Sequence, residues 1–113
     1  MKDWDAVAAF ALTLPGTELS TSYGKPAVRV RGKAFVYPGR EPGSFCVASP
    51  LEEKEFLMAT DPHTFWESPH YRGWPAVLVR HDGEDMERAR LVIARAWWDR
   101  ASMAQRTAFG PRP

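Results

Sequence analysis

Two short segments of this sequence interleave basic and aromatic residues, a combination suited to contact with a phosphate backbone and its bases. One begins at Tyr23-Gly24-Lys25-Pro26 and continues through a basic stretch to Lys33, and the other runs from Pro69 to Pro75. Lysine and arginine neutralise phosphates, while aromatic rings stack on bases. The candidate nucleic-acid-binding residues are Tyr23, Lys25, Arg29, Arg31, Lys33, His70, Tyr71, Arg72 and Trp74.

Both segments also have purely structural explanations. Their glycines and prolines can shape loops, Tyr71 and Trp74 can close the core, and Arg72 can pair with an acid of the preceding helix. For the aromatic residues we favour the core explanation. For the hairpin cations Lys25, Arg29, Arg31 and Lys33, a solvated hairpin and a phosphate-binding surface are equally compatible with the sequence.

Residues that could catalyse a reaction do not form a known constellation. The chain has no Gly-rich phosphate loop, no G-x-S-x-G elbow and no H-E-x-x-H pair. Cys46 is the one thiol, and although His70 could activate it, a cysteine inside a predicted strand is more often a small buried hydrophobe. His63, His70 and His81 lack the spacing of zinc ligands. We therefore expect a non-enzymatic protein without catalytic residues, metal site or cofactor.

Length and composition indicate one domain over residues 1–113. The hydrophobic content is 44%, and the lone cysteine excludes an internal disulfide and suits a reducing cytosol. The N-terminal stretch lacks the basic region and apolar run of a signal peptide, and no segment approaches the roughly 18 apolar residues of a membrane span. We therefore expect a cytoplasmic protein without a membrane partner.

The charges are distributed unevenly along the chain. The net charge is only +1, but no acid lies between Glu18 and Glu41, whereas acids outnumber the single base Lys54 between Pro50 and Glu67. Such asymmetry can give a local positive surface, or the two segments can neutralise each other in space. A near-neutral total charge argues against tight non-specific binding of nucleic acid.

Hydrophobic periodicity predicts an α+β fold. Helices are expected over 3–14, from Ser49 to about Ala59, and over about 85–103; strands are expected over 27–30, 33–37, 44–48 and 76–80. Short connections between strands favour an antiparallel sheet. The predicted architecture is one antiparallel sheet of about four to five strands packed with three main helices.

Several local features are predicted as well. Arg31-Gly32 is expected to form a two-residue hairpin turn. In that register Val28 and Val30 share one face with Phe35 and Tyr37, while Arg29 lies on the other face with Ala34 and Val36. Ser49-Pro50-Leu51-Glu52 matches a capping box in which Ser49 is the N-cap. The last five residues are expected to be frayed.

The chain resembles the MmcQ/YjbR-like family over nearly its whole length. The matching strings are Leu14–Gly16, Ser22–Ala27, Val30–Phe35, Asp61-Pro62, Thr64-Phe65, Pro69–Pro75, Val77–Val79 and Ala96-Trp97. The resemblance implies a double-wing-like or secretion-chaperone-like α+β fold and the label of a bacterial DNA-binding protein. This chain differs from commoner members in having Ala48 where they carry lysine, and the His-Tyr-Arg-Gly-Trp version of residues 70–74.

Two functional hypotheses follow. The first is a protein that binds DNA through the 23–33 hairpin and the 70–74 loop, where the cations contact phosphate and the aromatic residues stack. The alternative is a non-enzymatic module that binds a small ligand or a protein partner in an aromatic pocket, since five Trp, six Phe and three Tyr exceed what a small core needs.

Overall fold

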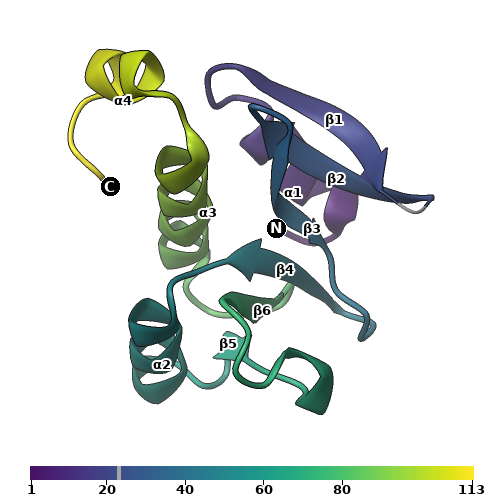
Figure 1. Cartoon of the computed structure of the whole chain (residues 1–113). Helices are drawn as coiled ribbons and strands as arrows, with labels where there is room; N and C mark the ends of the chain where they lie inside the picture. Colours follow the sequence, from purple (N-terminus) through teal and green to yellow (C-terminus); the bar gives the residue numbers. More distant parts are fainter. Residues whose placement is uncertain (23) are drawn as a thin grey trace.

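The computed structural model describes residues 1–22 and 24–113, and a six-stranded antiparallel sheet runs through it (Figure 1). The strands lie in the order β1-β2-β3-β4-β6-β5. They comprise β1 (Thr17–Ser22), β2 (Lys25–Val30), β3 (Lys33–Pro38), β4 (Ser44–Ala48), β5 (Phe65–Trp66) and β6 (Ala76–Arg80). The helices are α1 (Trp4–Ala11), α2 (Leu51–Thr60), α3 (Met86–Arg100) and α4 (Met103–Phe109), with a 3₁₀ turn η1 (Pro69–Tyr71).

The predicted α+β class and antiparallel sheet are confirmed, while the element counts are higher than expected. β1 was not predicted because its sequence TELSTS has a single large apolar residue. The long C-terminal helix is two helices, because Ser102 starts α4 with a capping box in which Gln105 is the reciprocal partner. No helix in the described part of the chain is long and apolar enough to cross a membrane.

The main core lies on one face of the sheet, under α1, α2 and α3. α1 contacts β2 and β3, α3 contacts β3 and β4, and α2 contacts β5 and β6. Trp97 of α3 is fully buried, and its indole N–H donates to the carbonyl of Pro15 at 2.8 Å. This bond satisfies the polar end of the largest core side chain and ties α3 to the loop before β1.

The predicted β2–β3 hairpin is confirmed, including its two-residue turn. Arg31 and Gly32 both have positive φ, at 54° and 75°, as a type I′ turn requires. The Arg29 guanidinium closes this turn, because its Nη1 donates to the carbonyl of Gly32 at 3.0 Å.

One irregularity in this hairpin decides which side chains face the core. Arg29 pairs with Ala34, but Val28 pairs with Val36, so Phe35 is an extra residue in β3. Such a bulge interrupts the alternation of side chains between the two faces of the sheet.

The predicted faces of Val36 and Tyr37 are therefore wrong, whereas that of Phe35 is confirmed. Phe35 and Val36 are both fully buried in the main core, although they are consecutive. Tyr37 instead packs with residues on the opposite face of the sheet, away from Val28 and Val30. The sequence pattern alone does not signal the bulge, and the bulge is what assigns Tyr37 to the other face.

The predicted capping box at Ser49 is also wrong. α2 has Pro50 as its N-cap residue and no side-chain cap bond. Ser49 remains part of the sheet region because its N–H donates to the carbonyl of Pro75 at 2.9 Å. Its hydroxyl donates to the carbonyl of Pro50 at 3.3 Å and makes no bond to the first turn of the helix.

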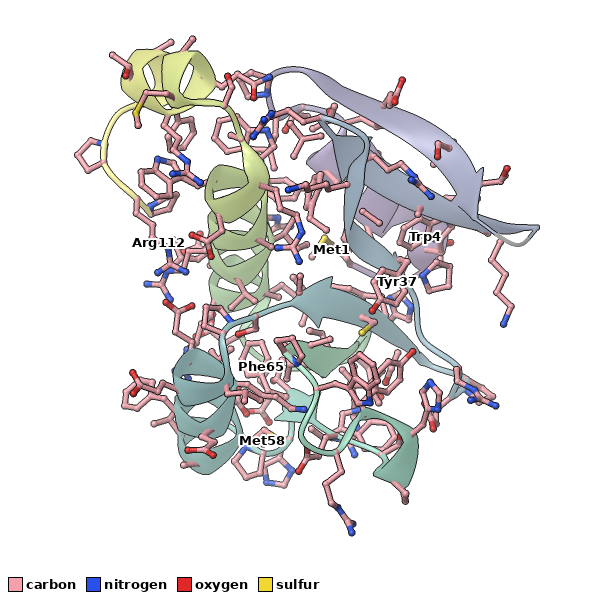
Figure 2. The ribbon with its side chains drawn as sticks, viewed as in Figure 1. Met1, Trp4, Tyr37, Met58, Phe65 and Arg112 are labelled. Carbon is pink, nitrogen blue, oxygen red and sulfur yellow. The ribbon has the colours of Figure 1, made fainter. Side chains whose placement is uncertain are left out.

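The C-terminal tail is anchored, so the prediction of a frayed end is wrong. The Arg112 guanidinium donates to Asp99 of α3 at 2.7 and 2.9 Å and also contacts both carboxylate oxygens of Glu53 of α2. Figure 2 shows Arg112 beside α3, where the tail turns back along the helix. The hydrogen bonds that Arg112 donates to Asp99 and then to Glu53 raise the pKa of Arg112 above its already high value. The tail thus joins α2 to α3.

Candidate functional site

A second, smaller cluster lies on the sheet face opposite the main core. Its buried members come from β4, β6 and η1 and are Cys46, Tyr71, Ala76 and Leu78. The half-buried side chains of Tyr37 and Trp66 pack against them. No helix of the main layer covers this face, which is partly covered instead by the 67–75 loop that contains η1. We refer to it as the open face.

Three protonated groups meet in this cluster. Cys46 is fully buried, and the side chains of Tyr37 and Tyr71 pack in the same cluster. Burial raises the pKa of Cys46 to about 11 and that of Tyr71 to about 12, and it raises the pKa of Tyr37 further above its ordinary value. At neutral pH all three groups keep their protons and form a neutral polar cluster. A thiol with this pKa and no exposure is not an activated nucleophile.

A buried lysine of α2 holds the 67–75 loop in place. The Nζ of Lys54 in α2 donates to the carbonyls of Tyr71 and Trp74 at 2.8 and 2.9 Å and forms an ion pair with Glu67 at 2.8 Å. These three partners use all three donors of the ammonium group, whose residue is only 1% exposed. The loop therefore has a defined position on the open face.

Two hollows lie on either side of Tyr37, whose position on β3 is marked in Figure 2. The first has a volume of about 220 Å³ and is lined by Lys25, Pro26, Ala27, Ala34, Tyr37 and Pro38. The second has a volume of about 240 Å³ and is lined by Tyr37, His70, Tyr71, Trp74 and Ala76. Because Tyr37 borders both, the two hollows are neighbours, and we refer to the pair as the Tyr37 groove; their walls are mainly small, proline and aromatic side chains.

The structure brings four of the nine candidate residues to this groove. Lys25 lies at one end, and His70, Tyr71 and Trp74 lie at the other. Tyr71 is buried in the open-face cluster, as the core explanation requires, whereas Trp74 is 63% exposed. The two aromatic residues of the loop thus have different environments, and Trp74 is the one whose ring is available to a ligand.

Arg40 and Arg72 place positive groups near His70 and Trp74. Arg40, from the loop after β3, approaches the His70 ring with its Nη1 2.7 Å from Nδ1, and His70 packs edge-on against Tyr71 at 4.8 Å. Arg72 is exposed next to the 3₁₀ turn. The second hollow therefore has cations at its rim.

The other hairpin cations extend away from the groove. Arg29 shares the outward side of β2 with Lys25, since both alternate with the core residues Val28 and Val30. Arg31 and Lys33 are exposed on either side of Gly32 at the tip, at the opposite end of β2 from Lys25. At about 3.3 Å per residue, this end lies roughly 20 Å from Lys25. Tyr23 lies outside the described residues.

Sequence reasoning missed the residues that organise this site. Tyr37 was assigned to the wrong face because the bulge is invisible in the pattern, and Lys54 was noted only as the lone base of an acidic stretch. A signal for Lys54 does exist: it lies three residues before the buried Leu57, on the same side of α2.

No metal centre is built into this part of the molecule. Among residues 1–22 and 24–113, no group of three or more His, Cys, Asp or Glu side chains is arranged to hold a metal ion. The chemistry that the open face offers is stacking, apolar contact and attraction for negative charge.

Comparison with known proteins agrees with this architecture. The YjbR family model matches residues 12–98. The chain belongs to the YjbR family. A crystal structure of Deinococcus radiodurans protein DR2400, which contains a DUF419 domain, superposes with a TM-score of 0.75 at 15% sequence identity, covering 97% of this chain and 89% of that one. This likeness shows a shared fold. No curated protein matches the sequence.

Proposed function

We propose that this YjbR-family protein binds single-stranded nucleic acid, DNA in the first instance, along the open face of its sheet. The observation that carries the proposal is the Tyr37 groove, whose two apolar hollows lie between the exposed ring of Trp74 at one end and Lys25 at the other. The proposal places this binding in the cytoplasm, where the single free thiol stays reduced.

The groove suits unpaired bases better than a duplex. Bases in a single strand expose their faces, which stack on aromatic side chains without a strict sequence requirement. Trp74 offers such a surface, and Tyr37 forms the wall between two adjacent hollows. In a duplex the bases stack on one another, so they cannot enter hollows of this kind without being flipped out.

Cations along the same face supply the attraction for phosphates. Lys25, Arg40 and Arg72 are exposed around the groove, and Arg31 and Lys33 are exposed at the hairpin tip. Arg29 lies opposite Glu18 of β1, so its charge is largely offset. Because these exposed cations are confined to one face, they can coexist with the near-neutral total charge. The affinity is then expected to be moderate and strongly dependent on salt.

The test is a fluorescence-anisotropy titration with labelled single-stranded and duplex DNA at several salt concentrations. Trp74→Ala should weaken single-strand binding by about 1–3 kcal/mol, roughly 5- to 150-fold. Lys25→Ala combined with Arg72→Ala should reduce the slope of log affinity against log salt by about 1.4, if each contacts one phosphate. Because all three side chains are exposed, the melting temperature should not change.

Arg90→Ala is the matched control. Arg90 is exposed on α3, which covers the core face, so it has the same charge as Arg72 but lies away from the groove. Its replacement should leave affinity and salt slope unchanged. No binding of either DNA form at low salt, or equal effects of the Arg90 and Lys25–Arg72 variants, would reject the proposal.

A small apolar ligand is the second candidate function. The first hollow supports it, because its lining is mainly Pro26, Ala27, Ala34 and Pro38, with few polar groups. Such a ligand would raise the melting temperature in a thermal-shift screen, and its affinity would not depend on salt. Ala34→Phe, which fills the hollow from β3, should abolish that shift.

A further inference from the structure

The two edges of the sheet differ in how well they are protected. β5 forms one edge, is two residues long and is contacted by α2. β1 forms the other edge, is six residues long and pairs with β2 in an unbroken register from Thr17 to Ser22. Among residues 1–22 and 24–113, no other helix or strand lies beyond the outer side of β1 in Figure 1. A regular edge strand presents a row of unpaired backbone N–H and C=O groups.

β1 lacks the features that usually prevent edge pairing. It has no proline, no lysine and no bulge, and Glu18 is its one charged residue. Leu19 pairs with the core residue Val28 and therefore points to the helix-covered side, yet it is 55% exposed. Because β1 is the last strand of the sheet, Leu19 has a cross-strand neighbour only on the side of β2, and its other side is exposed to solvent.

The sequence of β1 is also nearly symmetric about Leu19. Residues 17–21 read Thr-Glu-Leu-Ser-Thr, so reversing the direction places Thr on Thr, Leu on Leu, and Glu on Ser. Antiparallel pairing of two identical strands produces this reversal. Threonine pairs and apolar pairs directly opposite each other stabilise a sheet, and here no like charges lie directly opposite.

We propose that β1 is a self-association edge, which pairs antiparallel with β1 of a second copy of this chain about a two-fold axis at Leu19. Leu19 then contacts Leu19 of the second copy, and Thr17 lies opposite its Thr21. The two Glu18 side chains are diagonal neighbours on the open face, where each is already opposite Arg29 of its own chain. Charge repulsion between them is therefore offset.

This pairing joins the two sheets without reversing their faces. Leu19 lies opposite its own equivalent, so the core sides of both copies face the same way, and so do their open faces. The dimer is isologous and closed, because each copy contributes its one long edge and the remaining β5 edges are short. The proposal does not depend on whether the open face binds nucleic acid.

Sedimentation equilibrium of the full chain is the first experiment. The wild type should sediment at twice the chain mass, and Leu19→Lys should sediment as a monomer. Because Leu19 is more than half exposed, the substitution should leave the circular dichroism spectrum unchanged, which separates loss of pairing from loss of folding. A wild type that stays monomeric at the highest soluble concentration would overturn the proposal.

Disulfide cross-linking then tests the register. Leu19→Cys should form a covalent dimer under mild oxidation, since directly opposite Cα atoms lie about 4.5–5.5 Å apart. Thr17→Cys alone should not, because its two copies are offset by four residues, roughly 13 Å. An equimolar mixture of Thr17→Cys and Thr21→Cys should cross-link. The native Cys46 is fully buried and stays unreactive. Equal cross-linking of Thr17→Cys and Leu19→Cys would refute this register.

Discussion

Replacing Lys54 with methionine removes the ammonium group that holds the 67–75 loop while it keeps most of the apolar stem. The carbonyls of Tyr71 and Trp74 keep one backbone partner each, the N–H groups of Trp74 at 3.0 Å and of Ala76 at 2.8 Å, but each loses its hydrogen bond from a charged donor. A hydrogen bond to a charged group contributes about 1.5–3 kcal/mol. The ion pair with Glu67 adds at most about 1 kcal/mol, because the Glu67 side chain is 28% exposed and water can solvate it.

Part of this loss is recovered because the ammonium no longer has to be dehydrated. We therefore expect Lys54→Met to lower the free energy of unfolding by about 2–3 kcal/mol. For a chain of this size that corresponds to a fall in melting temperature of roughly 10 °C. The assay is urea denaturation at pH 7 followed by circular dichroism, analysed with a common m-value for both proteins.

Two variants control this measurement. Lys25→Met makes the same change at an exposed lysine and should leave stability unchanged. Glu67→Gln keeps a hydrogen-bond acceptor for Lys54 and should cost less than about 1 kcal/mol. If Lys54→Met lies within about 0.5 kcal/mol of wild type, or Glu67→Gln costs as much as Lys54→Met, the account of the lysine as the anchor of the loop is refuted.

Three further predictions test other features of the structure. The pKa of Cys46 is raised from 9.0 to about 11 and that of Tyr71 from 10.0 to about 12, so the unfolded chain ionises first. The contribution of these groups to the unfolding free energy should therefore be complete well below pH 9 and be lost as the pH rises from 9 through 11. Cys46→Ala should make that loss smaller in denaturation series at pH 8 to 11, and an unchanged slope would contradict the assignment. Alkylation of Cys46 by iodoacetamide should be undetectable in the native protein and rapid in urea, because the thiol is fully buried; fast native labelling would show that the cluster opens readily. Arg112→Ala should destabilise the chain by only about 1 kcal/mol, since its contacts are roughly one-third exposed, but should make the C-terminal residues sensitive to carboxypeptidase, whereas Arg90→Ala should do neither.

Local signals in the sequence predicted local structure well. The Arg31-Gly32 turn, β2, β3, β4 and β6, and the α+β class follow from turn chemistry and hydrophobic periodicity, because these act between near neighbours. β1 escaped prediction because it is a polar edge strand, which needs few apolar residues. It forms because backbone pairing with β2 is available.

Long-range contacts account for the rest of what was missed. Lys54 reaches residues that follow it by 13 to 20 positions, and Arg112 reaches Glu53 across 59 positions. No periodicity encodes such pairs, since their partners are set by how the elements pack. The candidate site shows the same division: the segments 23–33 and 69–75 were recognised, but Tyr37, which links them, was not.

The extra residue Phe35 makes the length of β3 as important as its composition. Deleting Phe35 would restore regular alternation with Ala34 outward, Val36 inward and Tyr37 still on the open face, because the bulge already absorbs the extra residue. The groove would keep its central ring, and the main core would instead lose one of two consecutive buried side chains. In alignments of this family, a single-residue gap in β3 would therefore separate chains whose cores pack differently, while both kinds of chain can keep the groove.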